Sequence, residues 1–153
     1  MMDNKPMAIT KVLTVNDIGS NNSHQAGMCI PKTGEVLHFF PDLGCQVKNP
    51  RTVMFFEDAY GEIWKLNFIY YNNKLFDEKG TRNEYRLTGM TAFFRENNLI
   101  PGDSITLIHG SDGTDYIKYK RQKQLETIQG DGIESSTRKK IVLGDNNWKV
   151  VDY

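Results

Sequence analysis

Two clusters of polar side chains are the parts of this sequence best suited to recognise a ligand. The first lies between Gly19 and Gly27 and offers a row of short hydrogen-bonding groups: Ser20, Asn21, Asn22, Ser23, His24 and Gln25. Asn and Gln can bond adenine through two hydrogen bonds, and small residues let a backbone approach its ligand closely. The cluster suits contact with nucleic acid, and a solvated loop is the alternative interpretation.

The second cluster is charged. Arg82, Glu84 and Arg86 alternate in the sequence, so in an extended strand they share one face. Arg reads guanine with its planar fork, and Glu accepts a hydrogen bond from cytosine N4. The set could therefore read base edges, or it could be an exposed ladder of ion pairs. Basic residues also gather at positions 118–123 and 138–140, which suits phosphate contact or protection of a sheet edge.

Patterns for catalysis or metal binding are missing from the sequence. It has no Ser nucleophile elbow, no phosphate-cradling glycine loop and no His-Glu-x-x-His. The three histidines, His24, His38 and His109, are scattered, and Cys29 lies far from Cys45, whereas a structural zinc site needs closely spaced ligand pairs. We therefore expect no cofactor, no metal and no catalytic site.

A small metal-dependent nuclease is the enzyme that stays open as an alternative. Glu57, Asp58 and Glu62 lie near Lys65 and could hold a divalent cation. These carboxylates lie on both sides of a Tyr-Gly turn, and their side chains are expected to point to alternate faces of the hairpin. Solvated charges at a hairpin are the simpler interpretation.

Composition sets the broad class. A chain of 153 residues with 39% apolar and 25% charged residues predicts one globular domain. Its apolar runs are too short to cross a membrane, and no signal peptide is visible, so with only two cysteines we expect a reduced, cytoplasmic protein. Lys+Arg and Asp+Glu are 19 each, so nucleic-acid binding would depend on a local patch.

Short stretches between Gly and Pro residues predict a mostly β protein. Strands are expected at residues 9–15, 52–58, 62–70, 85–88, 104–109 and 116–121, with a last hairpin from 140–143 and 147–151. A helix is expected over 90–98, capped by Thr88 or Thr91, and a short one from Pro31. Residues 16–29, 72–83 and 126–137 are predicted as polar connections. Short strands at this spacing indicate a sandwich or barrel.

Strict alternation marks the predicted core. One face of the strand at 62–70 carries Trp64, Leu66, Phe68 and Tyr70. We expect this face to point into the core and Phe93 and Phe94 to close it from the helix.

Taken together, three motifs indicate a family. Residues 16–32 contain SHQAG followed by IPK, residues 82–88 read RNEYRLT, and residues 99–107 follow the pattern L-x-x-G-D-x-x-x-L. Over residues 13–107 the sequence resembles the N-terminal effector-binding domain of EcoRII-type restriction endonucleases, a DNA-binding pseudobarrel similar to the plant B-three domain. SHQAG with IPK is the most specific part.

The resemblance implies an open seven-stranded β-pseudobarrel with one or two short helices at its ends. It also implies two arms that grip the DNA major groove: a first arm at residues 16–32 and a second arm at residues 72–86. Lys32 and Lys74 are expected to hold phosphates. The predicted DNA-binding residues are Ser20, Asn21, Asn22, Ser23, His24, Gln25, Lys32, Asn73, Lys74, Arg82, Asn83, Glu84 and Arg86.

The function that the resemblance implies is sequence-specific binding of double-stranded DNA, as the effector or targeting module of a type II restriction endonuclease. Enzymes of that family carry a separate nuclease domain, and nothing in these 153 residues resembles one. The expected partners are double-stranded DNA and a nuclease domain, fused or separate, and no membrane. A barrel that binds a sugar or peptide is a further alternative, favoured by the zero net charge.

Overall fold

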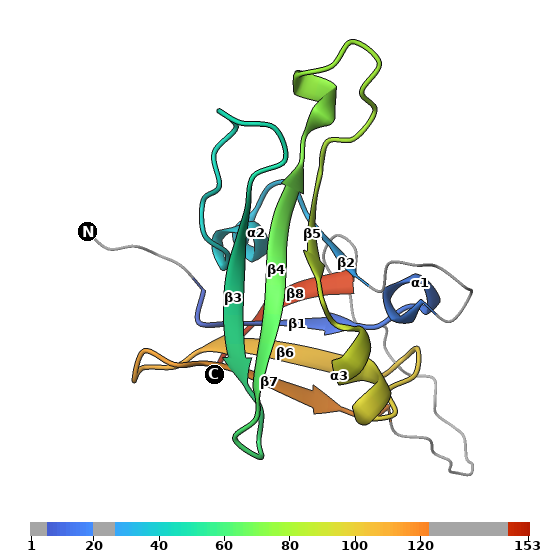
Figure 1. The fold of residues 1–153 in the computed structure, drawn as a ribbon. Helices are drawn as coiled ribbons and strands as arrows, with labels where there is room; N and C mark the ends of the chain where they lie inside the picture. The colour runs from blue at the N-terminus through green and yellow to red at the C-terminus, as the bar shows by residue number, and fades with distance from the viewer. Residues whose placement is uncertain (1–5, 20–26, 123–146) are drawn as a thin grey trace.

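Eight strands form one strongly curved sheet in the computed structural model, which describes residues 6–19, 27–122 and 147–153 (Figure 1). The strand order is β2-β5-β4-β3-β7-β6-β1-β8. The strands are β1 Ala8–Val12, β2 Met28–Ile30, β3 Arg51–Glu57, β4 Ile63–Tyr71, β5 Glu84–Thr88, β6 Ser104–His109, β7 Asp115–Lys120 and β8 Trp148–Val151. The helices are α1 Val15–Ile18, α2 Glu35–His38, α3 Thr91–Glu96 and the 3₁₀ turn η1 Asn73–Leu75.

This architecture confirms the predicted mostly β pseudobarrel, with one more strand and more short helices than expected. All neighbouring strands are antiparallel except β3 and β7, which are parallel and joined by the single pair Glu57 and Tyr116. The two edge strands, β2 and β8, approach one another where Trp148 Nε1 donates to the Cys29 carbonyl at 2.9 Å. The barrel is therefore open but bridged at its seam.

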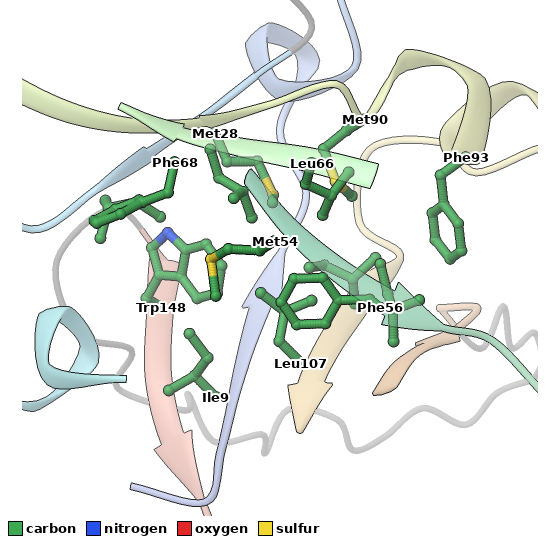
Figure 2. Packing of buried hydrophobic residues seen from close by; sticks show 14 of the residues in the cluster. Ile9, Met28, Met54, Phe56, Leu66, Phe68, Met90, Phe93, Leu107 and Trp148 are labelled. Atoms are coloured by element: carbon green, nitrogen blue, oxygen red, sulfur yellow. The ribbon is translucent and has the colours of Figure 1, made fainter. Parts of the chain in front are cut away.

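The core follows the predicted alternation of β4. Leu66, Phe68 and Tyr70 are buried, and the half-buried Trp64 packs its ring edge-on against Phe93 with 5.2 Å between centroids. Phe94 is also buried in α3. Figure 2 shows part of this cluster from close by, including Trp148 of β8, Phe68 and Ile9. Both parts of the core prediction are confirmed.

Two local predictions were wrong. Residues 16–29 were expected to be a loop, but α1 begins after Thr14, whose Oγ1 accepts from Asp17 N at 3.2 Å while Asp17 Oδ2 accepts from Thr14 N at 2.8 Å. This reciprocal pair is a capping box. Neither Thr88 nor Thr91 caps α3, because Met90 occupies the N-cap position without a side-chain hydrogen bond.

The predicted last hairpin is described only in part. Residues 140–143 and the polar connection at 126–137 lie outside the described residues. The second predicted strand is present as β8, and among the described strands it pairs with β1.

Replacing Thr14 with alanine is expected to lower the free energy of unfolding by about 1 kcal/mol, because the Asp17 amide loses its capping acceptor. Urea denaturation measures this change. The exposed Thr33 is the matched control, and Thr33→Ala should stay within about 0.5 kcal/mol of the parent protein. Equal effects of the two substitutions would contradict a stabilising role for the cap.

Candidate nucleic-acid interface

The second arm is a closed loop that projects from the end of β4 and β5 (Figure 1). Its base is fastened by two hydrogen bonds, from Lys74 N to the Arg82 carbonyl at 3.0 Å and from Arg82 N to Asn73 Oδ1 at 2.8 Å. A Cβ atom on Gly80 would collide with the Asn73 carbonyl, so this turn requires glycine. The arm therefore has a defined shape before any ligand binds.

The predicted charged set is brought together at the base of this arm. Arg82 donates to Glu84 Oε2 from Nη2 at 2.5 Å and from Nε at 3.1 Å, and its guanidinium lies 4.1 Å from the centroid of the Tyr71 ring. Arg86 Nη1 lies 3.8 Å from the same carboxylate oxygen. Glu84 thus holds the Arg82 guanidinium by hydrogen bonds and forms a looser ion pair with Arg86. Tyr71, which the sequence reasoning missed, supports Arg82 from its ring face.

Arg86 also connects this cluster to the first arm. Its Nη2 donates to the Gly27 carbonyl at 3.2 Å, and its buried Nε has no hydrogen-bond partner among the described residues. Its side chain is 19% exposed, compared with 36% for Arg82. Arg82 is therefore the more accessible of the two forks, and Arg86 positions Gly27 as well.

The remaining predicted residues of the second arm divide into structural and exposed groups. The side-chain oxygens of Asn73 and Asn83 serve the arm itself, accepting from Arg82 N and from the Tyr70 hydroxyl at 2.7 Å. Lys74 is exposed on η1. Lys32 is also exposed and lines a hollow together with Asn83 and Glu84, so the end of the first arm lies beside the base of the second.

The central part of the first arm, with the predicted residues Ser20, Asn21, Asn22, Ser23, His24 and Gln25, lies outside the described residues. Both of its flanks are attached to the barrel. Before it, Lys11 Nζ of β1 pairs with Asp17 Oδ2 of α1 at 2.7 Å, and both side chains are buried. After it, β2 pairs with β5 along its whole length.

The three carboxylates considered for a nuclease site, Glu57, Asp58 and Glu62, lie in and beside the hairpin turn between β3 and β4. Asp58 Oδ1 accepts from Tyr60 N and Glu62 N, and Oδ2 accepts from Trp64 Nε1 at 2.9 Å. Burial alone would raise the pKa of Asp58, but the hydrogen bonds from Trp64, Glu62 and Tyr60 lower it below its usual value. No group of three or more His, Cys, Asp or Glu in the described part of the chain could hold a metal ion.

Of the basic residues at 118–123, the structure describes Lys118, Lys120 and Arg121, which lie on or directly after β7, away from the second arm. Lys118 and Lys120 are exposed on β7, and the fork of Arg121 donates to the carbonyls of Asn97 and Asn98 at the end of α3. Residues 138–140 are not described. Within the described ranges, no helix is long and apolar enough to span a bilayer.

Comparisons with known proteins place most of this chain beside one family of domains. A family model described as "Restriction endonuclease EcoRII, N-terminal" matches residues 4–103. Auxin response factor 10 of Arabidopsis thaliana is 30% identical over 122 residues, which are 78% of this chain and 16% of that protein. The AP2/ERF and B3 domain-containing transcription factor RAV1 of the same plant is 32% identical over 114 residues, covering 72% of this chain and 29% of that protein.

A solved structure has the same fold. The Arabidopsis FUS3–DNA complex aligns over 74% of this chain and 96% of that chain, with a TM-score of 0.56 and 20% sequence identity. The auxin response factors that this chain matches are much longer proteins, and the chain spans only 16–18% of their length.

Proposed function

Because the chain belongs to the family of restriction endonuclease EcoRII N-terminal domains, we propose that it binds double-stranded DNA in a sequence-specific manner through its two arms. The observation that carries this proposal is the preformed Arg82–Glu84–Arg86 set at the base of the second arm. Ordered guanidinium forks suit the paired acceptors of guanine, and a carboxylate suits the cytosine amino group. The FUS3 relative, whose structure contains DNA, supports the same kind of ligand.

In this proposal the second arm enters the major groove, which is about 12 Å wide. Arg82 reads a base edge, and Glu84 and Arg86 complete the reading set. The exposed Lys32 and Lys74 bind phosphates and fix the register of the protein on the duplex. The first arm adds Ser20, Asn21, Asn22, Ser23, His24 and Gln25 as further contacts.

We propose further that the chain is the effector or targeting module of a type II restriction endonuclease. The family description supports this role. Selection of binding sites from a random duplex pool tests the DNA proposal directly, since a sequence-specific binder enriches one motif. Failure to enrich any duplex, together with salt-independent binding of a sugar or peptide, would favour the ligand-binding barrel instead.

Plasmid DNA incubated with the purified chain and magnesium is expected to stay uncut. The reason is that both oxygens of Asp58 accept hydrogen bonds from the hairpin backbone and Trp64, so that among the described residues Glu57 and Glu62 have no third ligand beside them. Gel electrophoresis of the plasmid measures the outcome. Cleavage by the parent protein that disappears in Glu62→Ala would support the metal-dependent nuclease.

A further inference from the structure

The connection before β3 is fastened to the second arm by a pair of asparagines. Asn72 is fully buried, and its Oδ1 accepts from Asn49 N at 2.6 Å while Asn49 Oδ1 accepts from Asn72 N at 3.1 Å. Asn72 Nδ2 also donates to the Val47 carbonyl at 3.0 Å. Asn49 has a φ of 53°, a left-handed conformation that Asn tolerates. Residues 47–49 therefore form a fixed part of the arm base.

Lys48 lies within this fastened segment but is itself accessible. Its Nζ is 2.6 Å from Asp77 Oδ2 of the arm, and the two side chains are 48% and 45% exposed. Exposed ion pairs of this kind contribute little to stability. The buried asparagines therefore hold the backbone in place, whereas the Lys48 ammonium can exchange Asp77 for another anion.

The sheet order fixes the side of the arm on which this lysine lies. The order β2-β5-β4-β3 places the second arm, which joins β4 and β5, between β2 and β3. Residues 47–49 precede β3 and lie at the same end of the long strands as the arm (Figure 1). They flank the arm on the side away from β2, the strand that ends the first arm.

We infer that residues 47–49 and the second arm are one DNA-recognition unit in which Lys48 binds a backbone phosphate. This inference rests on the proposed DNA binding. Phosphate backbones border the major groove on both sides, so a cation beside an arm that fills the groove meets a phosphate. Asn49 and Asn72 are the positioning residues for Lys48.

The test is a set of anisotropy titrations with the selected duplex and a scrambled duplex at several salt concentrations. Lys48→Ala is expected to weaken binding to both duplexes several-fold and to reduce the slope of log affinity against log salt by about one. Asp77→Asn should strengthen binding, because it frees Lys48 and removes a negative charge near the phosphate. Lys120→Ala, an exposed lysine on β7, should change neither quantity.

The positioning role is tested by Asn49→Gly, which permits the left-handed backbone but removes the acceptor for Asn72 N. In this background Lys48→Ala should have a smaller effect than in the parent protein, because the lysine is no longer held in place. Fully additive effects would overturn the positioning role. If the parent protein binds DNA, and Lys48→Ala binds with the same affinity and the same salt slope as the parent, the role of Lys48 is wrong but the proposed function stands. If the parent protein binds no duplex, the proposed function itself is wrong.

Discussion

Replacing Arg82 with alanine is expected to lower affinity for the cognate duplex about tenfold or more, while binding to a scrambled duplex changes little. A guanidinium fork on guanine contributes about 1–3 kcal/mol of discrimination. Arg82 is positioned for this contact by Glu84 and by the Tyr71 ring, and it is the more exposed arginine of the pair. Titrations with the two duplexes at two salt concentrations measure both affinities.

Two further variants separate base reading from charge. Arg82→Lys keeps the charge but loses the planar fork, so it should also lose discrimination. Lys118→Ala, on the exposed side of β7, should have little effect on specificity. The zero net charge of the chain helps this test, since little bulk attraction masks the loss of one contact. If Arg82→Ala weakened both duplexes equally, the arm would be a phosphate clamp and the base-reading proposal would be abandoned.

Arg86 is expected to behave differently from Arg82. Its fork holds the Gly27 carbonyl, so Arg86→Ala removes a predicted base contact and also releases the end of the first arm. The motif match places His24 in that arm, so His24→Ala is the variant that tests the first arm while Arg86 itself stays unchanged.

The elements that were predicted well are those with local causes. The alternation of β4 follows from the two-residue period of a strand, so its buried face could be predicted from the sequence. The Arg82–Glu84–Arg86 set was predictable for the same reason, because residues two apart share a face. In contrast, α1 is four residues long and too short to show helical periodicity, although Thr14 and Asp17 have the spacing of a capping box.

The parts that could not be predicted depend on contacts between distant residues. The bond from Arg86 to Gly27 joins positions 59 apart in the sequence, and that from Asn49 to Asn72 joins positions 23 apart. No local pattern encodes either contact, since each depends on the order of strands in the sheet. The sequence therefore predicts which residues the second arm carries, whereas the fold determines what holds them.

Replacing Trp148 with alanine is expected to lower the free energy of unfolding by about 3–5 kcal/mol, the usual cost of truncating a buried tryptophan. Its side chain is fully buried, packs edge-on against Phe40 with 6.4 Å between centroids, and bonds the Cys29 carbonyl. Because β8 and β2 are the two edges of the sheet, this residue bridges the seam of the barrel. Urea denaturation followed by circular dichroism measures the change.

Trp148→Phe separates the contribution of apolar packing from that of the hydrogen bond, because it keeps most of the apolar contact and removes the indole N–H donor. It should cost less than the alanine change but at least the roughly 1 kcal/mol of a typical hydrogen bond. Tyr60, which is 86% exposed, is the control aromatic, and Tyr60→Ala should stay within about 0.5 kcal/mol of the parent. A loss below about 1 kcal/mol for Trp148→Ala would mean that β8 adds little to the barrel, and that the β2–β5 ladder and the bond from Arg86 to Gly27 suffice to hold the end of the first arm.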